Sequence, residues 1–447
     1  MAFLPEFGSV LMTLLAFVVA LSIIVAIHEY GHYIVGRWSG IHAEVFSLGF
    51  GPKLWSRVDK RGTRWQLALL PFGGYVRFLG DADAASSPDS DVVRQMSAAE
   101  RRHTMQGAPL WARTATVAAG PVFNFILSIA VFAVLFMARG EVAEPLTVGD
   151  MRALPGGALE LREGDQVLAV NGVAVPDFDD GVAMDAFARA VPGTAALTYK
   201  VVRDGATMEV AGPNLYPPLI TQLAPQSAAY DAGLKSGDVI TEVEGEAIVT
   251  FDQLKAHVED GQGRAIKLVV FRPGIDEILD FVLAPRRVDE PKPEGGFRTE
   301  WRVGIVGGLA FEPATVTVGP ITALWNGVTQ TGRIVTSSFS GLWHMITGAI
   351  STCNMTGPIG IAQTSGAMAS QGVESFVWFV AALSTAVGML NLFPIPVLDG
   401  GHLVFYAFEA VTGRPPSDKA LRILMAAGLT LILSVMLFAL SNDLFCP

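Results

Sequence analysis

Four long, strongly apolar runs without a charged residue divide the chain. They cover residues 7–27, 114–138, 375–398 and 423–442. Each run is close to the ~20 apolar residues that a helix needs to cross the hydrocarbon core of a bilayer. The pattern predicts a multi-pass α-helical membrane protein with four transmembrane helices. The long segment between the second and third runs is more polar and is expected to fold outside the bilayer.

The composition agrees with a membrane protein that carries a soluble part. Of the 447 residues, 51% are hydrophobic and 16% are charged, whereas soluble domains carry about 25% charged residues. The mean hydropathy is +0.43. The net charge of −11 argues against nucleic acid as a partner. The two cysteines, Cys353 and Cys446, lack the spacing of a metal motif, so thiolates are not expected to hold a metal.

The distribution of basic residues predicts an orientation. The segment 37–113 contains eleven Lys and Arg residues, which places it in the cytoplasm by the positive-inside rule. Both termini and segment 139–374 are then outside. No basic residue precedes Arg37, so the first run is interpreted as a span rather than a signal peptide. Segment 313–353 is rich in polar residues around Arg333 and is expected to lie on the outer membrane surface, not to cross it.

A repeat lies in the outer segment. Residues 161–172 (LREGDQVLAVNG) align with residues 234–245 (LKSGDVITEVEG) at an offset of 73. In each copy a Gly-Asp turn precedes an alternating strand pattern, which resembles bacterial PDZ domains. The repeat predicts two inserted PDZ-like α+β domains. Such domains bind extended peptides by strand addition; alternatively, the pair only excludes bulky molecules.

The cytoplasmic segment contains a hairpin pattern. Residues 65–70 and 75–78 read as strands on either side of a Gly73-Gly74 turn, and residues 42–50 form a plausible third strand. We expect a membrane-associated β-hairpin here. Its exposed edge, with Gly73 and Gly74, is a candidate for binding an extended substrate; the alternative is an ordinary surface hairpin.

Ionisable residues interrupt the end of the first apolar run. His28 and His32 are four residues apart, so on a helix their imidazoles point the same way and can share one Zn²⁺. Glu29 lies beside them and is a candidate general base for a water at the metal. Charged side chains are costly in hydrocarbon and usually have a function there.

A third ligand is expected from the third run. That run ends in residues 391–400 (NLFPIPVLDG), and Asp399 supplies a carboxylate from another membrane segment. A catalytic zinc takes three protein ligands and keeps one position open. The alternatives are that Asp399 only caps a helix or starts a turn, or that His402 is the ligand. The two prolines, Pro394 and Pro396, predict a break in the helix, tolerated where it lines a cavity.

These motifs together resemble the site-2 protease family of intramembrane zinc metalloproteases. The resemblance rests on HEYGH at 28–32 and the NLFPIPVLDG run, and extends to AGPVFNF at 119–125 and PFGGYV at 71–76. It implies one zinc ion per chain, held by His28, His32 and Asp399, in a bacterial inner-membrane protein. It also implies that Asn391 and Asn124 contact the substrate backbone, although hydrogen bonding between helices is their more usual duty.

The resemblance implies a zinc metalloendopeptidase that cleaves single-span membrane proteins within the bilayer. The implied substrate is an anti-sigma factor that has already been cut in the periplasm, within an envelope stress response, and remnant signal peptides are a further class. The alternatives are a catalytically inactive PDZ scaffold or chaperone, and a zinc transporter. A transporter needs ionisable residues along a path, which the second and fourth runs lack.

The expected organisation follows from these patterns. It comprises a first span with the zinc motif (1–36), a cytoplasmic loop with the hairpin (37–113), a second span (114–138), two PDZ-like domains (139–212 and 213–290), a periplasmic linker with a surface helix (291–372), a third span with the Asp ligand (373–400), and a cytoplasmic loop with the fourth span (401–447).

Overall fold

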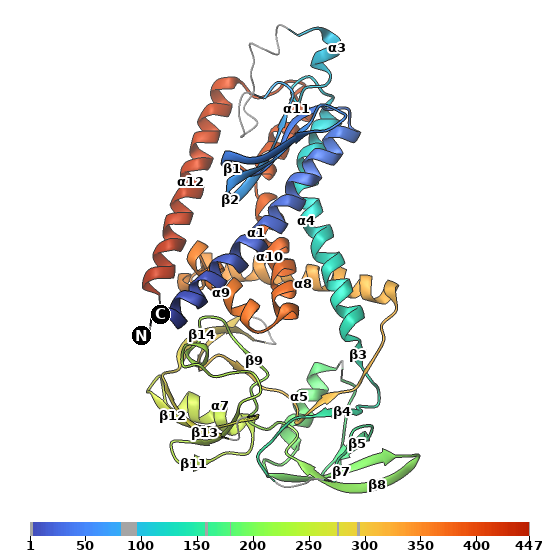
Figure 1. Ribbon diagram of the computed structural model, residues 1–447, viewed down its shortest axis with the longest axis vertical. Helices are drawn as coiled ribbons and strands as arrows, with labels where there is room; N and C mark the ends of the chain where they lie inside the picture. Colours follow the sequence, from blue (N-terminus) through green and yellow to red (C-terminus); the bar gives the residue numbers. More distant parts are fainter. Residues whose placement is uncertain are drawn as a thin grey trace. The chain divides into compact units, whose positions relative to one another are not determined.

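The structure is a computed structural model, and it describes residues 3–81, 96–156, 160–178, 180–274, 277–292 and 296–446. The chain divides into two compact units. The helical unit contains residues 1–135, 321–343 and 352–446, and the insert unit contains residues 136–320 and 344–351. Figure 1 shows long helices in the first unit and small sheets in the second.

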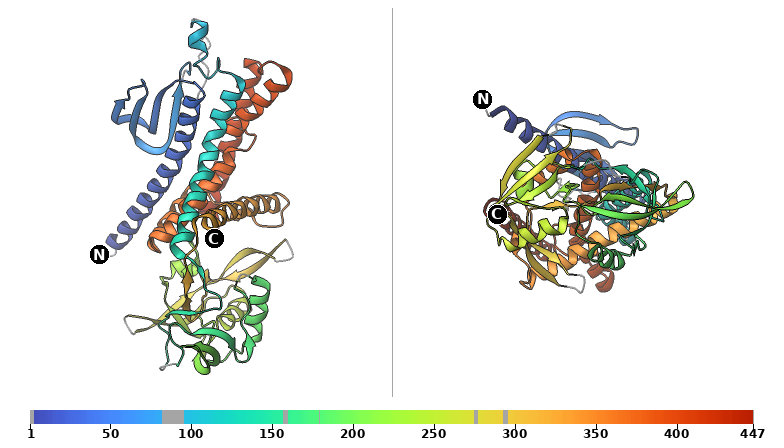
Figure 2. Two further views of the ribbon diagram at one scale, coloured as in Figure 1. Left: turned by 90° about the vertical axis from the view of Figure 1, so that its right-hand side faces the viewer. Right: turned by 90° about the horizontal axis from the view of Figure 1, so that it is seen from below.

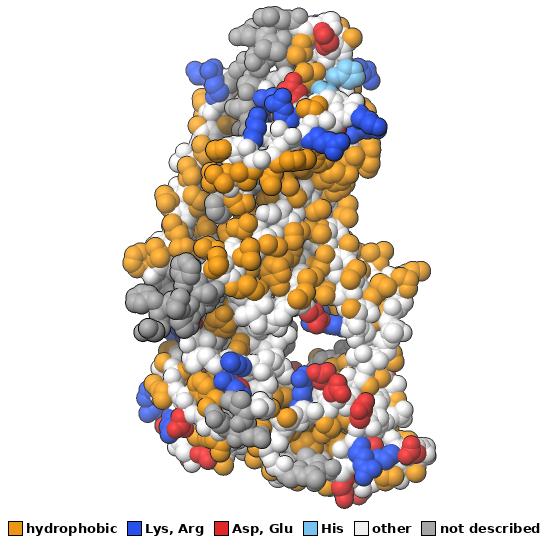
Figure 3. Space-filling view, viewed as in Figure 1, with side chains coloured by type: hydrophobic (Ala, Val, Ile, Leu, Met, Phe, Trp, Pro, Cys, Tyr) orange, Lys and Arg blue, Asp and Glu red, His pale blue; other side chains and the backbone are white. Residues whose placement is uncertain are grey.

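Four helices are long and apolar enough to cross a membrane among the described residues. They are α1 (Phe3–Trp38), α4 (Leu110–Arg139), α10 (Val373–Asn391) and α12 (Asp418–Phe445). Each coincides with one of the four uncharged runs of the sequence. On the face drawn in Figure 3, apolar side chains cover the helices, and Lys and Arg side chains gather at the end that carries the β1–β2 hairpin. The chain is therefore a membrane protein with added β structure.

Small residues let the helices of this unit approach closely. A Cβ atom on Gly31 of α1 would lie 2.5 Å from the carbonyl oxygen of Ala119 in α4. A Cβ atom on Gly366 of α9 (Pro358–Ser370) would lie 2.3 Å from the Thr13 hydroxyl in α1. Only glycine fits at such contacts, and helix packing in membranes favours them. They hold α1 against both neighbours.

The third span ends where the prolines predict. Helix α10 stops at Asn391, residues 392–398 are not helical, and α11 (Asp399–Thr412) begins directly afterwards. The break packs tightly, because a Cβ atom on Gly400 would lie 2.3 Å and 2.2 Å from the carbonyl oxygens of Leu392 and Phe393. The sequence did not predict α11 as a helix. Its first residue is the expected metal ligand.

Segment 313–353 forms one long helix, α8 (Pro320–Ile346), which is not among the candidate spans. In Figures 1 and 2, α8 runs across the direction of α4 and α12. Its buried face carries the small residues Ala323, Gly327 and Thr331, while Trp325 and Trp343 are 68% and 64% exposed. This amphipathic helix agrees with the expectation of a non-crossing segment.

The hairpin consists of β1 (Ala43–Val58) and β2 (Arg64–Phe78), which pair with each other and curl. Ser47 of β1 pairs with both Gln66 and Tyr75 of β2, so the first part of β1 lies between the two halves of β2. The Gln66 amide donates to the Ser47 hydroxyl at 3.1 Å and to the Tyr75 hydroxyl at 3.1 Å. The expected third strand at 42–50 is therefore the central one.

The two sequence repeats have the same topology in the insert unit. One four-stranded sheet has the order β6-β5-β7-β8 with helix α5, and the other has the order β11-β10-β12-β13 with helix α7. Bounds for the first module are β5 (Gln166–Val170), β6 (Val173–Ala174), α5 (Gly181–Ala190), β7 (Ala196–Arg203) and β8 (Ala206–Pro213). Those for the second are β10 (Val239–Val243), β11 (Glu246–Ala247), α7 (Phe251–Asp260), β12 (Ile266–Arg272) and β13 (Glu277–Leu283).

Each repeat also carries the same buried ion pair. Asp165 accepts two hydrogen bonds from the Arg203 guanidinium at 2.7 Å, and Asp238 accepts two from Arg272 at 2.7 Å. Both carboxylates are 1% exposed. Each also accepts from a backbone N–H three residues earlier, closing the turn before the strand. The Gly-Asp pattern of the sequence thus marks two equivalent structural anchors.

The modules extend beyond the boundaries expected from the sequence. Val303 belongs to the hydrophobic core of the second module, and Ala310 and Phe311 belong to that of the first. Short strands make these connections: β16 (Ile305–Val306) pairs with β9 (Gln222–Leu223), β17 (Phe311–Pro313) with β4 (Val148–Met151), and β18 (Thr315–Val316) with β3 (Glu141–Val142). Residues 303–316, expected within a linker, are thus built into both modules. The hairpin of β14 (Arg286–Pro291) and β15 (Phe297–Arg302) precedes them.

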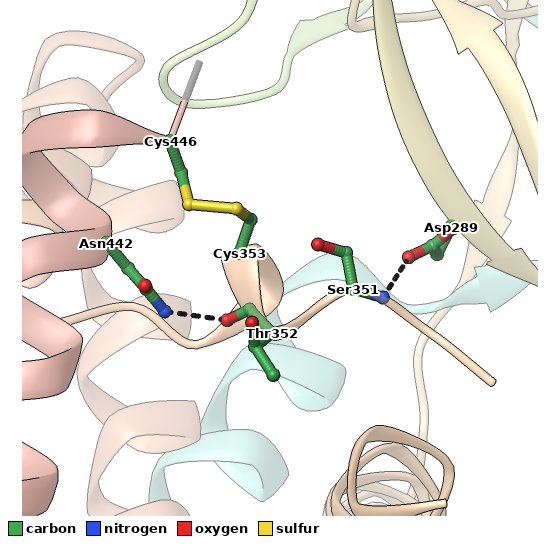
Figure 4. Close-up of a disulfide and its surroundings, with 6 residues drawn as sticks. All are labelled: Asp289, Ser351, Thr352, Cys353, Asn442 and Cys446. Carbon is green, nitrogen blue, oxygen red and sulfur yellow. Dashed lines mark hydrogen bonds between the residues drawn. A yellow bond between two sulfur atoms is a disulfide. The ribbon is translucent and has the colours of Figure 1, made fainter. Parts of the chain in front are cut away.

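A disulfide joins Cys353 to Cys446, with a Cα–Cα distance of 5.6 Å (Figure 4). Cys353 follows α8, and Cys446 follows the last residue of α12. The Asn442 amide of α12 also donates to the carbonyl oxygen of Thr352 at 2.7 Å. This pairing was not predicted, because two cysteines 93 residues apart give no local signal.

Candidate active site

The first two predicted ligands lie on α1 as their spacing requires. The Nε2 atoms of His28 and His32 are 3.2 Å apart. The two rings meet edge to face, at an interplanar angle of 84°. The helix is unbroken from residue 3 to residue 38, so the four-residue spacing alone places both imidazoles on one side.

Asp399 brings the third ligand atom to the same point. Its Oδ2 atom lies 3.2 Å from His28 Nε2 and 3.5 Å from His32 Nε2. The three residues form the one metal-type cluster of His, Cys, Asp and Glu found in the described part of the chain. Asp399 is the first residue of α11, but no side chain caps the N-terminus of that helix. The helix-cap interpretation of this carboxylate therefore does not apply.

The arrangement fits a zinc ion. Ligand atoms about 2.0–2.2 Å from a tetrahedral zinc are about 3.3 Å from one another, and the three observed distances are 3.2, 3.2 and 3.5 Å. Asp399 Oδ2 is buried and makes no hydrogen bond within the described residues. A buried carboxylate oxygen without a donor is costly, and a cation between the three atoms would remove that cost.

The predicted base lies between the metal cluster and the hairpin. Glu29 follows His28 on α1 and is half-buried. A Cβ atom on Gly74 of β2 would lie 3.2 Å from Glu29 Cγ and 3.0 Å from the side chain of Val25. Glycine is thus needed for the hairpin to reach α1 at this point. The structure brings Gly74 to the site, and the neighbouring Gly73 has a φ of +146°, which favours glycine.

The other nitrogen of each imidazole also has a partner. His32 Nδ1 lies 2.9 Å from the carbonyl oxygen of Thr116. His28 Nδ1 lies 3.1 Å from the Asn124 amide nitrogen. Asn124 is fully buried in α4, and its backbone carbonyl accepts from the Ser128 and Ser384 hydroxyls. Such outer contacts orient metal-binding histidines.

Residues of α4 and α11 complete the site without having been predicted. A Cβ atom on Gly120 would lie 2.3 Å from His32 Nε2, so only glycine leaves room for the imidazoles. The Arg113 guanidinium forms a paired ion contact with Glu409 at 2.6 and 3.0 Å, which ties α4 to α11. Gly120 lies in the AGP sequence, but no spacing rule relates it to His32. Only the packing reveals it.

The remaining candidates are placed less centrally. His402 is in α11 and packs edge to face on Phe405, outside the metal-type cluster. Asn391 is the last residue of α10 and is half-buried. One turn before it, Gly388 packs against Pro121 and Asn124 of α4. The end of α10 thus adjoins the helix that contacts His28.

Comparisons with known proteins identify the family of this chain. Residues 16–435 match the model of peptidase family M50. A protein of Agrobacterium fabrum named as a zinc metalloprotease is 36% identical over 96% of this chain and 94% of its own length. The regulator of sigma-E protease RseP of Escherichia coli is 32% identical over 97% of this chain and 99% of its own length.

The family model covers most of the chain, and the relatives align over nearly all of it. The metal-type cluster lies on α1 and at the first residue of α11. The chain belongs to peptidase family M50, the site-2 protease family, and is a zinc metalloprotease.

Proposed function

We propose that the chain is an intramembrane endopeptidase that cleaves single-span membrane proteins with zinc held by His28, His32 and Asp399. The observation that carries this proposal is the convergence of three ligand atoms, 3.2–3.5 Å apart. Two come from the candidate span α1, and the third comes from Asp399, which follows the break after the candidate span α10. A peptide bond that reaches this cluster is cut at membrane depth.

The proposed chemistry divides between metal and protein. When bound, zinc supplies a Lewis acid that polarises the scissile carbonyl and acidifies the attacking water. Glu29 takes a proton from that water and later delivers it to the leaving amine nitrogen. Its half-buried carboxylate beside His28 suits this task, because it is close to the metal cluster without belonging to it.

The substrate is proposed to bind in an extended form. A helical peptide keeps its carbonyls in internal hydrogen bonds, so the scissile bond is accessible only when the helix unwinds. The edge of β2 at Gly73 and Gly74 can pair with an extended backbone, and Gly74 touches Glu29. Asn391 is proposed as a second backbone contact, since it lies at the end of α10 beside the break that leads to Asp399.

The proposed substrate class comes from the relatives. Matched proteins from Salmonella typhimurium and Escherichia coli are named regulator of sigma-E protease. By analogy, we infer an anti-sigma factor whose outer domain has been removed by a first cut, and remnant signal peptides as a second class. Both are single apolar spans with a short outer tail.

The proposed orientation places both termini and the insert unit in the periplasm of a bacterial inner membrane. Eleven Lys and Arg residues in segment 37–113 favour a cytoplasmic location for that loop. The Cys353–Cys446 disulfide supports the same orientation independently, because disulfides persist in the periplasm and are rare in the cytoplasm.

The two modules of the insert unit are proposed to be PDZ-like and to exclude substrates with large outer domains. Support comes from their shared topology and from the Gly-Asp turns directly before β5 and β10. Recruitment of a new peptide end by strand addition is the alternative role.

A set of three substitutions tests the proposed mechanism. Glu29→Gln should reduce cleavage of a single-span substrate by at least about 1000-fold, because the proton acceptor is lost, while one zinc per chain remains. Asp399→Ala should lower both zinc content and cleavage, since two imidazoles leave the metal under-coordinated. His402→Ala is the matched control and should retain zinc.

The measurements are metal content of the purified protein and the cleavage rate in lipid. Near wild-type cleavage by Glu29→Gln would remove Glu29 from the role of base. Loss of zinc from His402→Ala with retention in Asp399→Ala would transfer the ligand role to His402.

A further inference from the structure

An apolar groove lies inside the helical unit beside the break between α10 and α11. Its volume is about 240 Å³, below the ~300 Å³ at which sites for whole small molecules begin. All of its lining side chains are apolar, and its walls include Phe125, Val335, Phe339, Met389, Leu392 and Phe393. A groove of this size accommodates one or two apolar side chains, and it offers no partner to a charged one.

Two walls of the groove come from segments that also contact the metal cluster or its neighbours. Phe125 directly follows Asn124, whose amide lies 3.1 Å from His28 Nδ1. On the other side, the carbonyls of Leu392 and Phe393 pack against Gly400, the residue after Asp399. One wall thus belongs to the helix that contacts His28, and the other packs against the residue next to Asp399.

Helix α8 supplies the outer wall. Val335 and Phe339 are four residues apart and present their side chains on the same face. The Phe339 ring stacks on the Phe393 ring, with centroids 5.8 Å apart and planes 28° apart. Phe339 is 50% exposed, so the groove is open on the side of α8. These two side chains determine how large a group can enter.

We propose that this groove is the subsite for a large apolar side chain of the substrate next to the scissile peptide bond. Val335 and Phe339 set its size, and they select leucine-sized groups over alanine. The inference rests on the proposed function, because only a cleaved membrane span brings such side chains to the metal cluster. The occupant is therefore a substrate side chain from an unwound apolar segment.

The test uses the full-length protein in lipid nanodiscs. A panel of single-span substrates differs only in the residues flanking the cleaved bond, which are Ala, Leu or Trp. Val335→Trp fills the groove, and it should lower the Leu-to-Ala ratio of kcat/KM by at least about 10-fold, the scale of discrimination in apolar pockets. Phe339→Ala enlarges the groove and should raise the Trp-to-Leu ratio by a similar factor.

The matched control is Trp325→Ala. Trp325 lies on the same helix and is 68% exposed, but it does not line the groove. Both ratios should remain at wild-type values in this variant. Zinc content should be unchanged in all three variants, since none of the substituted residues belongs to the metal-type cluster.

Wild-type ratios in both Val335→Trp and Phe339→Ala would overturn the subsite. A lipid that native mass spectrometry finds in the wild type and not in Val335→Trp, with ratios unchanged, would assign the groove to an acyl chain instead. If cleavage depends on Glu29 but the kcat/KM ratios are the same in both variants as in the wild type, the subsite is rejected and the proposed function is not. Absence of Glu29-dependent cleavage for every substrate rejects the proposed function and the subsite with it.

Discussion

Asn124 illustrates how one buried side chain can set the chemistry of a metal ligand. Its amide nitrogen faces His28 Nδ1 at 3.1 Å, while its Oδ1 atom is buried and makes no hydrogen bond among the described residues. A metal on Nε2 requires the proton on Nδ1, so His28 must then donate at Nδ1. Rotation of the amide brings Oδ1 to that position and supplies the acceptor.

The position of Asn124 changes the role expected for it. The sequence suggested a contact with substrate, whereas its position beside His28 Nδ1 favours positioning of the imidazole. His32 needs no such side chain, because the Thr116 carbonyl oxygen already lies 2.9 Å from its Nδ1. The two ligands of one helix are thus held by different means.

A conservative pair of substitutions tests this role. Asn124→Leu should weaken zinc binding by about 10–100-fold, because Nδ1 loses its acceptor. Asn124→Asp keeps an acceptor and should retain most of the affinity. The measurement is competition with a zinc chelator, which does not depend on activity. Val134→Ala, at an exposed position of the same helix, is the control and should bind zinc as the wild type does. Equal affinity in the Leu and Asp variants would contradict the positioning role.

At the scale of elements, the end of α12 is joined to the start of α9. The Asp443 carboxylate accepts hydrogen bonds from the backbone N–H groups of Gly357, Ile359 and Gly360, at 2.8–3.0 Å. The disulfide lies next to these contacts. It closes a loop of 93 residues that includes α9, α10, α11 and α12. Since α9 packs on α1 through Gly366, the fourth span is linked to the helix that carries the histidines.

Removal of this disulfide should destabilise the helical unit. For a loop of this length, loss of the cross-link should lower the free energy of unfolding by about 4–5 kcal/mol. Thermal unfolding of the Cys353→Ala, Cys446→Ala double variant, followed by tryptophan fluorescence in detergent, should show a lower Tm. Reductant should lower the wild-type Tm towards that value and leave the variant unchanged. Identical curves without reductant would show that the disulfide carries no stability.

The buried ion pair in the first module predicts a dependence on pH. Burial raises the pKa of Asp165, but the hydrogen bonds from Arg203 and from the Arg162 N–H outweigh it and hold the pKa below its ordinary range. A carboxyl whose folded pKa is lowered stabilises the fold above its unfolded pKa of about 3.9. That contribution is lost as the pH falls towards the folded value.

Asp165→Asn should therefore destabilise the first module at neutral pH, since Arg203 loses its carboxylate partner. Hydrogen exchange of β5 and β7 in the full-length protein measures this loss, and the difference from wild type should shrink as the pH falls below about 4. Asp150→Asn, at an exposed position in β4, should have little effect. A loss that does not vary with pH would rule out the charge of Asp165 as its cause.

At the scale of the whole chain, the insert unit begins and ends at neighbouring residues. Strand β3 pairs with β18, with Val142 opposite Thr315, and the Ala143 N–H donates to the Ala314 carbonyl at 2.9 Å. Both modules therefore lie between two points that a short linker can join. Strands β16 and β17 belong to the module cores, so a deletion of the modules has to include them.

Replacement of residues 144–313 by a short glycine linker tests the role of the insert. If the modules exclude large outer domains, the shortened protein should retain zinc and should cut both trimmed and untrimmed single-span substrates. The wild type should cut only the trimmed form. Cleavage rates of the two substrates, measured with equal zinc loading, distinguish exclusion of large domains from recruitment of substrate. Slower cleavage of the trimmed substrate with no gain on the untrimmed one would favour recruitment by strand addition.

Local pattern in the sequence was sufficient for much of this protein. Four uncharged runs predicted the apolar helices, because a bilayer requires a fixed length of apolar chain. The four-residue spacing of His28 and His32 predicted their common face, because helix geometry alone determines it. The prolines at 394 and 396 predicted the break before Asp399, since proline cannot continue a helix. The Gly-Asp repeat predicted two modules of equal topology.

Contacts between distant segments required the tertiary structure. Gly120 makes room for His32, Asn124 faces His28 Nδ1, and Cys353 pairs with Cys446. No periodic pattern in the sequence indicates any of these three contacts. The same holds for residues 303–316, which were expected in a linker. Each of their short strands pairs with a strand more than 80 residues away, so the local sequence does not indicate it. The sequence by itself determined where the apolar helices and the two repeats lie, and which residues are candidates for binding zinc. Only packing decided which glycines, amides and carbonyls surround that site, because close approach depends on shape and not on period.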